Sequence, residues 1–366
     1  MIPLVAPMIT QSDQDYLRDR ISDDLLSSDR EVRLFEERFS SRLGVAGAVA
    51  VNSGTSALQL ALLALGAVGG AEVVFPSYTC VALLNACHAC GAVPVLVDNG
   101  FDVSRARFHL DLAEARSKIS ARTRAIIVPH MFGTVAEIGP YLGDVPVVED
   151  FTLSLGALAV GGRTAGSLGT IGVCSLHESK MISCGRGGIV VSDDEVLLAR
   201  VRRLADYDGL APSWRLESTE RTEGRYEPAY SFGMTSMQAA LGNSQLSQFD
   251  LFLERRLALA TRYTNRFELA GIDCPEVPGD GSNVFFRYLI AAPGRVERTL
   301  RSLSERGIEG GRGVYPPLHM LLGLGGDGFP GAARCAATLL SVPVHPSITD
   351  DEADYVAESF VQATER

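Results

Sequence analysis

A short stretch at residues 175–188, SLHESKMISCGRGG, places a lysine between a strand-like run and a glycine-rich turn. This lysine, Lys180, is one of only two in a chain that has 33 lysine and arginine residues. The other, Lys118, fits the solvent face of the helical pattern DLAEARSKI. A bias towards arginine does not explain Lys180, because a guanidinium stays protonated whereas a buried amine can lose its proton and attack a carbonyl. The stretch therefore indicates a lysine that forms a Schiff base, beside glycines that let the backbone fold around a planar ligand.

A second stretch, VNSGTSALQLALLALG at 51–66, follows a strand-like run and opens a helix. Gly54 permits a tight turn, while Thr55 and Ser56 bring hydroxyls to the free N–H groups at the positive end of the helix dipole. This arrangement suits a phosphate, although serine and threonine are also ordinary helix N-caps. Ser175, five residues before Lys180, could reach a phosphate in the same site.

A third stretch, VPVVEDFTLSLGA at 145–157, ends an apolar run with Glu149 and Asp150. Such an aspartate could protonate a pyridine nitrogen, bind a metal or a ribose hydroxyl, or lie in solvent. A phosphate-binding turn, an aspartate and a lysine, in that order on an α/β sheet, are together what pyridoxal 5'-phosphate (PLP) requires. Asp150 would keep the ring nitrogen protonated, and Lys180 would hold the aldehyde and move protons.

The elements that must position these residues alternate between strand-like and helical patterns from 48 to 207. Many of the strand-like runs are continuously apolar, as in strands buried on both faces. They lie at 48–51, 72–75, 93–98, 124–130, 145–150, 171–176 and 188–192, with helix candidates at 55–66, 79–90 and 110–119. This rhythm predicts an α/β fold with a mainly parallel seven-stranded sheet covered by helices, which binds ligands at the carboxyl ends of its strands.

The rhythm changes after about residue 245. A long helical pattern at 248–269 is followed by a turn-rich link, a strand in VFFRYLIAA, a helix near 295–306 and a final helix that Thr349 can cap. We expect a large PLP-binding domain at 1–245 and a smaller α+β domain at 246–366. The mostly helical segment 1–40 is expected to pack on the smaller domain or on a partner subunit.

Composition narrows the class of protein. The formal net charge of −11 over 366 residues disfavours a surface for nucleic acid or anionic membrane. The apolar stretch near 57–70 is interrupted by Gln59, and the N-terminus has no basic region of a secretory signal, so we expect a cytoplasmic enzyme.

Cysteines and histidines do not indicate a metal site. Seven cysteines are an odd number, and Cys80, Cys87 and Cys90 are interpreted as small buried side chains on one helix. His130, His177, His319 and His345 are scattered without metal-binding spacing, and His130 either lines the site or is satisfied in the core.

With these residues in place, the chain resembles the sugar aminotransferases of the DegT/StrS type, a branch of the fold-type I PLP enzymes. The resemblance spans nearly the whole chain and follows the order of that family's landmarks. They include FEERFSSRLGV, VNSGTSALQLAL, EVVFPSYTCVALLNACHACGAVPVLVD, TRAIIVPHMFG, VVEDFTLSLGA, GSLGTIGVCSLHESKMISCGRGGIVVSDDE, MTSMQAALG, YPPLH and LLSVPVHPSITDDE.

The resemblance implies a role for each matching residue. Lys180 matches the Schiff-base lysine, Asp150 the pyridinium partner and Ser175 the phosphate-binding serine. Gly54, Thr55 and Ser56 match the phosphate-binding turn, and the YPPLH segment places Tyr315 and His319 near the substrate. The family implies a homodimer with both active sites at the interface. It also implies amino transfer from glutamate or glutamine to a keto sugar, usually nucleotide-linked, in a secondary-metabolite or polysaccharide pathway.

Several positions depart from the family pattern. Leu153 stands where a glutamine contacts the cofactor's phenolic oxygen, and Cys80 where an aromatic ring stacks on the cofactor. Ser231 replaces an asparagine that reaches the phosphate from the partner subunit, Gly233 replaces an arginine, and Thr170 an aspartate. These changes suggest altered cofactor contacts and an acceptor that is an unusual keto sugar, a keto cyclitol or another small carbonyl compound.

Two other functions stay open at this point. One is a different PLP reaction, such as elimination, dehydration or decarboxylation, although the family's dehydratases carry histidine in place of the lysine. The other is a regulator or scaffold that binds the cofactor without catalysis.

Overall fold

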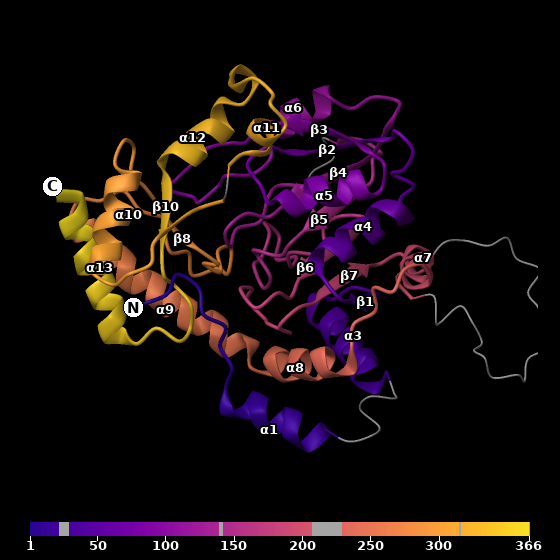
Figure 1. Cartoon of the computed structure of the whole chain (residues 1–366), viewed down its shortest axis with the longest axis horizontal. Coiled ribbons are helices and arrows are strands. Elements are labelled where there is room, and N and C mark those ends of the chain that lie inside the picture. The colour runs from indigo at the N-terminus through magenta and orange to yellow at the C-terminus, as the bar shows by residue number, and fades with distance from the viewer. Residues whose placement is uncertain (22–28, 139–141, 207–228, 315, 366) are drawn as a thin grey trace, which may run out of the picture.

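The computed structural model describes residues 1–21, 29–138, 142–206, 229–314 and 316–365. Its larger sheet has seven strands in the order β1-β7-β6-β5-β4-β2-β3 (Figure 1). Their bounds are β1 Gly47–Val51, β2 Glu72–Pro76, β3 Val93–Val97, β4 Thr123–Pro129, β5 Val147–Asp150, β6 Ile171–Ser175 and β7 Gly188–Ser192. β7 runs antiparallel to β1 and β6, and the other neighbouring strands are parallel to each other. The predicted mainly parallel seven-stranded sheet is confirmed, and each strand lies within two residues of its predicted bounds.

Helices cover both faces of this sheet because its strands are apolar on both sides. On one face, Val49 and Val51 of β1 join a core with α4 (Gly54–Ala64), α5 (Val81–Ala89) and α7 (Glu195–Ala205). On the other face, Ala48 and Ala50 pack in a core with α3 (Arg30–Leu43) and α8 (Ser236–Ser247). The alternation along β1 is the period of two that a strand imposes. The short helix α6 (Leu112–Ser117) packs near the β2 and β4 side.

The N-terminal segment lies mainly on the larger sheet. We expected residues 1–40 on the smaller domain or a partner, but α3 packs against β1 and α8 of its own chain. The preceding helix α1 (Gln11–Arg20) is tied to α8, where Gln245 Nε2 donates to Asp13 Oδ2 over 2.7 Å. The first residues do reach the smaller C-terminal part, as expected, where Ile2 forms an isolated bridge with Ile308.

The second sheet is antiparallel and has three strands in the order β8-β10-β9. The strands are β8 Tyr288–Ala291, β9 Gly311–Arg312 and β10 Leu339–Val342, and the helices of this part are α10 Val296–Glu305, α11 Leu318–Leu321, the 3-10 helix η2 Gly326–Gly328, α12 Pro330–Thr338 and α13 Asp350–Glu365. As predicted, Thr349 caps α13: its Oγ1 accepts from Glu352 N over 3.2 Å, and Glu352 Oε2 accepts from Thr349 N over 2.9 Å.

Helix α9 (Phe249–Leu269) connects the two parts, as Figure 1 shows. Its early residues Phe249 and Phe252 pack in the core of the larger sheet, and Tyr263 and Phe267 pack in the core of the smaller one. Because one continuous helix enters both cores, the domain boundary near residue 245 stays a prediction.

The cysteines correct one expectation. Cys80 is exposed and stands at the N-cap of α5, outside the helix, whereas Cys87 and Cys90 are buried as predicted. Across the described ranges, no three His, Cys, Asp or Glu side chains cluster closely enough to hold a metal ion. In the same ranges, none of the helices combines the length and the apolar character needed to cross a membrane.

A carboxylate after β3 joins the two parts. Asp98 accepts hydrogen bonds over 2.7 Å from the N–H groups of both Gly331 and Ala332, in the first turn of α12. A Cβ at Gly331 would lie 1.8 Å from the carbonyl oxygen of Asn99, so the start of α12 is pressed against this loop. Asp98 therefore satisfies two free N–H groups at the positive end of the helix and fixes α12 against the larger sheet.

We expect Asp98→Ala to lower the free energy of unfolding by about 1–3 kcal/mol, because two charge-assisted hydrogen bonds are lost. Urea denaturation measures the change. The control Asp144→Ala removes an exposed aspartate and should stay within about 0.5 kcal/mol of the wild type. Equal stability of the two variants would contradict the role of Asp98.

Candidate active site

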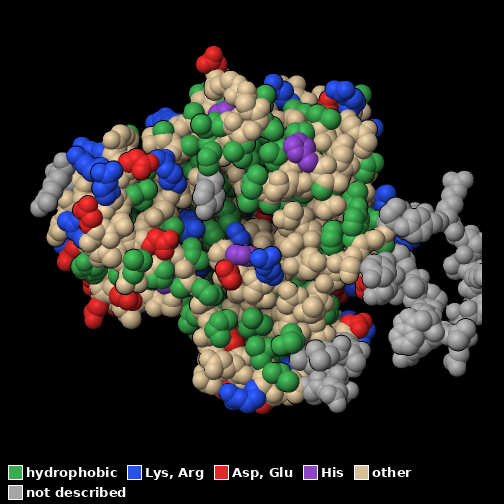
Figure 2. Space-filling view, in the orientation of Figure 1, with side chains coloured by type: hydrophobic (Ala, Val, Ile, Leu, Met, Phe, Trp, Pro, Cys, Tyr) green, Lys and Arg blue, Asp and Glu red, His purple; other side chains and the backbone are tan. Residues whose placement is uncertain are grey.

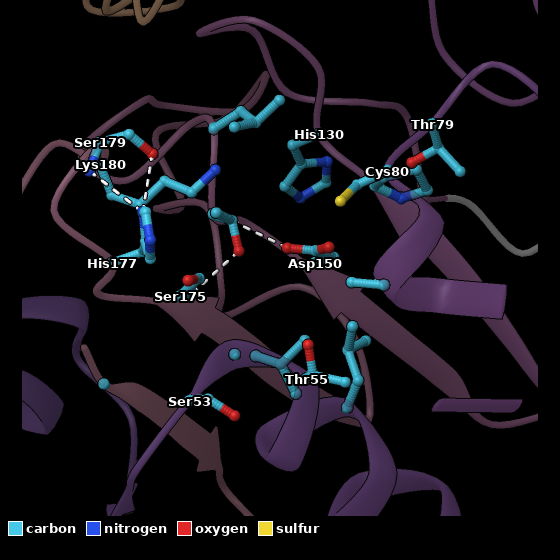
Figure 3. Close-up of a pocket in the computed structure, with 18 of the residues that line it drawn as sticks. Ser53, Thr55, Thr79, Cys80, His130, Asp150, Ser175, His177, Ser179 and Lys180 are labelled. Carbon is cyan, nitrogen blue, oxygen red and sulfur yellow. Dashed lines mark hydrogen bonds between the residues drawn. The ribbon is translucent and has the colours of Figure 1, made fainter. Parts of the chain in front are cut away.

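The strand ends of the larger sheet surround a cleft of about 360 Å³. Figure 2 shows the molecule hollowed between the part around β8 and β10 and the part around β5 and β6. In Figure 3, Lys180, His130 and Cys80 are arranged around Asp150, with Ser53 and Thr55 on the other side of it. Six of the predicted site residues line the cleft: Gly54, Thr55, Cys80, Asp150, Ser175 and Lys180.

Lys180 lies in the loop between β6 and β7, where its N–H donates to His177 O over 2.9 Å. The side chain is half-buried, and Nζ lies 5.4 Å from the centre of the Phe286 ring. Burial lowers the pKa of Lys180 below its ordinary value, and the nearby Cys80 and Asp150 oppose this effect. Lowering the pKa favours the neutral amine, the form that attacks an aldehyde.

Asp150 is the last residue of β5 and points into the same cleft. Its Oδ1 accepts from Thr152 N over 3.1 Å, and Thr152 Oγ1 accepts from Ser175 N over 2.9 Å (Figure 3). Burial raises the pKa of Asp150, and the Thr152 hydrogen bonds and Lys180 oppose the rise. No described residue forms an ion pair with this carboxylate, so a cationic ring nitrogen in the cleft would meet an otherwise unpaired acid.

The turn before α4 forms the opposite end of the cleft. Ser53 is the N-cap of α4 and accepts from Ser56 N over 3.1 Å. A Cβ at Gly54 would lie 2.5 Å from Cβ of Ser175, so only glycine allows the turn to approach the end of β6 this closely. Free N–H groups, the Thr55 hydroxyl and Ser175 thus surround a space that suits a phosphate.

Three of the described site residues that we predicted do not line this cleft: Ser56, Ser231 and His319. The hydroxyl of Ser56 is used within the turn, donating to Asn52 Oδ1 over 2.7 Å. Ser231 is exposed, although its carbonyl oxygen accepts from Asn52 Nδ2 over 3.4 Å. His319 is buried, with Nδ1 2.7 Å from Ser77 Oγ and its ring stacked on Phe329. Tyr315 lies outside the described residues.

The polar cleft residues that the prediction from sequence missed include Ser53, Thr152 and Arg186. Ser53 could have been found, since it precedes the glycine of an expected helix start. Thr152 follows Asp150 by two residues, but its role depends on reaching Ser175 in the neighbouring strand, which no local pattern reveals. Leu153, which departs from the family pattern, also lines the cleft.

A fully buried carboxylate and the imidazole that is hydrogen-bonded to it lie behind Asp150. Glu149 Oε1 lies 2.7 Å from His130 Nε2, and both side chains are completely buried. His130 Nδ1 accepts from Ala136 N over 3.0 Å, which places the ring proton on Nε2, facing Glu149. The carboxylate also accepts from the N–H groups of Gly166, Leu168 (2.8 Å) and Gly169 (2.9 Å). Burial alone would raise the pKa of Glu149, but these donors lower it below its ordinary value of 4.5.

We expect Glu149→Gln to lower the free energy of unfolding at pH 7 by about 2–4 kcal/mol, since an amide cannot accept from donors on all sides. The ionised form stabilises the fold above pH 4.5, the ordinary pKa of the group, and this contribution is lost as the pH falls through the lower folded pKa. The difference between variant and wild type should therefore shrink below pH 4.5. Denaturant titrations at several pH values measure it, with the exposed Glu178→Gln as control. A difference that does not change with pH would contradict an ionised Glu149.

An α/β sheet that brings a lysine, an aspartate and a glycine-containing phosphate turn to one cleft defines the fold-type I PLP-dependent enzymes. Within this class, the chain belongs to the DegT/DnrJ/EryC1/StrS aminotransferase family, whose profile matches residues 7–361. A GDP-perosamine synthase from Caulobacter vibrioides is 32% identical over 378 residues, which cover 99% of this chain and 98% of that protein.

Two further relatives agree with this assignment. A dTDP-4-dehydro-2,3,6-trideoxy-D-glucose 4-aminotransferase from Saccharopolyspora spinosa is 29% identical over 381 residues, covering 100% of this chain and 97% of that protein. The solved structure of the aminotransferase TlmJ from Streptoalloteichus hindustanus has a TM-score of 0.86 at 28% identity, covering 99% of this chain and 98% of that one. The predicted PLP cofactor, aminotransferase class and sugar aminotransferase function are confirmed.

Proposed function

We propose that the protein transfers the amino group of glutamate or glutamine to the carbonyl of a nucleotide-linked 4-keto sugar. The observation that carries this proposal is the placement of Lys180 and Asp150 in one cleft whose other end is the Gly54 turn. The names of the relatives support the acceptor, since one forms GDP-perosamine and another aminates a dTDP-linked 4-dehydro sugar.

The residues present fit PLP. Gly54, Thr55 and Ser175 would hold its phosphate, Asp150 its ring nitrogen and Lys180 its aldehyde carbon. When bound, the cofactor supplies an electron sink that stabilises negative charge at the carbon bearing the amino group. Asp150 can serve this chemistry because it is buried, so its negative charge is stabilised when a protonated ring nitrogen lies beside it.

Lys180 would have a second role whenever its amine is not bonded to the cofactor. Its Nζ would take up the proton from the substrate carbon and later donate it, acting as general base and then as general acid. The lowered pKa of Lys180 suits both roles, because a pKa closer to neutral pH lets the amine both accept and donate a proton. Cys80 and Leu153 line the same cleft, so the contacts around the cofactor would differ from the family pattern at these two positions.

Lys180→Ala should lose the visible absorbance of the lysine-bound cofactor and reduce turnover by at least roughly a hundredfold, because no amine remains to hold the aldehyde or move the proton. The matched control is Lys118→Ala, which removes the other lysine of the chain and should leave both unchanged. An unchanged spectrum and turnover in Lys180→Ala would make the assignment wrong.

The amino-donor half-reaction tests the function itself. Glutamate added to the loaded enzyme should yield 2-oxoglutarate and the amine form of the cofactor, and GDP- or dTDP-linked 4-keto sugars should then return the aldehyde form. Turnover of a keto cyclitol, and not of these sugars, would show that the acceptor is a cyclitol and not a nucleotide-linked sugar. Failure with every amino donor would exclude transamination in favour of another PLP reaction or a cofactor-binding regulator.

We further propose a cytoplasmic homodimer with active sites at its interface. Support comes from exposed apolar side chains directly after His319, with Met320 61%, Leu321 54% and Leu324 47% exposed. A second subunit would cover these side chains beside the cleft.

Sedimentation equilibrium should therefore give twice the chain mass of 39.1 kDa. Leu321→Glu should shift the protein towards monomer, since a charge at a buried contact is costly, while Leu269→Glu at another exposed position should not. A monomeric wild type with full activity would contradict the dimer.

A further inference from the structure

The start of β7 lies where two other strands end. Gly188, the first residue of β7, pairs with Val51 at the end of β1 on one side and with Ser175 at the end of β6 on the other. Because β7 is antiparallel to both, the residues just before it lie at the edge where the phosphate turn begins. The packing is close, since a Cβ at Gly188 would lie 2.3 Å from the carbonyl oxygen of Ser53.

Arg186 precedes this strand by two residues and lines the cleft. Its backbone is fixed, because Gln238 Nε2 donates to Arg186 O over 2.8 Å and Gln238 belongs to the capping box that starts α8. Its side chain is exposed, and its guanidinium has no hydrogen bond, ion pair or ring contact with any described residue. The loop thus presents an available guanidinium at the cleft.

The charge of a phosphate group and the lack of charged groups in the turn around Gly54 indicate a ligand for this guanidinium. A phosphate monoester carries between about one and a half and two negative charges at neutral pH. The groups of the turn around Gly54 are neutral hydroxyls and N–H groups, with only the partial positive charge of the helix end. Among the side chains that line the cleft, Lys180 and Arg186 are the lysine and arginine, and Lys180 is needed at the aldehyde. Arg186 is therefore the full positive charge available to the phosphate.

We propose that Arg186 binds the phosphate of PLP and supplies the positive charge that the turn of Ser53, Gly54 and Thr55 lacks. A guanidinium can donate two parallel hydrogen bonds to phosphate oxygens, which are stronger than those from neutral donors. This inference rests on the cofactor site proposed above and adds a residue to it.

The test compares PLP with pyridoxal, which lacks the phosphate. Apo protein with Arg186→Gln should bind PLP roughly 10- to 100-fold more weakly than the wild type, the usual effect of losing hydrogen bonds to a charged group. Its affinity for pyridoxal should be unchanged, and Arg186→Lys should restore part of the PLP affinity. Absorbance titration measures each of these dissociation constants, so the readout does not depend on turnover.

Arg163→Gln is the matched control, since Arg163 is also exposed but does not line the cleft. Thermal unfolding of the apo proteins establishes that each variant is folded. An equal change for PLP and pyridoxal, or no change for either, would overturn the proposal. Unchanged PLP affinity with a raised KM for the nucleotide-linked sugar would assign Arg186 to the substrate instead. Failure of amino transfer by the wild type would reject the proposed function but leave the PLP comparison valid.

Discussion

The close approach of three strand ends is the constraint on which the site depends. β1, β6 and β7 meet at Val51, Ser175 and Gly188, and the chain leaves no space there for a side chain on Gly54 or Gly188. A bulkier residue at either glycine would push the turn away from the end of β6 and separate Ser175 from the start of α4. The shape of the cleft thus depends on the close packing of these strand ends. The backbone packing positions the catalytic groups, and their own hydrogen bonds are not needed for this.

Two adjacent carboxylates on β5, Glu149 and Asp150, have different roles: the first stabilises the fold and the second lies in the cleft. Successive side chains on a strand point to opposite faces. Glu149 therefore faces the interior, where His130 and backbone N–H groups satisfy it, while Asp150 faces the cleft with few protein partners. Hydrogen bonds favour the ionised form of Glu149. Asp150 has few protein partners and can bind a cation in the cleft. This contrast is the physical basis for assigning different roles to two adjacent acids.

Much of this could be predicted from the sequence. The strands were identifiable because they are continuous apolar runs, and Lys180 and Asp150 because their chemistry is unusual at strand ends. What sequence patterns could not give were relations between segments. The antiparallel direction of β7 brings its start to the turn of Ser53, so that Arg186 and Ser53 line the same cleft, and nothing in GRGG reveals that direction. The packing of α3 on its own sheet likewise depends on distant neighbours.

The helix α9 has a mechanical consequence. With 21 residues it is about 30 Å long, and its two ends are anchored in different hydrophobic cores. A continuous helix resists bending, so it acts as a rigid strut that holds the β8–β10 sheet at a set distance from the strand ends. The same helix therefore limits how far the smaller sheet can swing away from the cleft when a bulky sugar nucleotide enters.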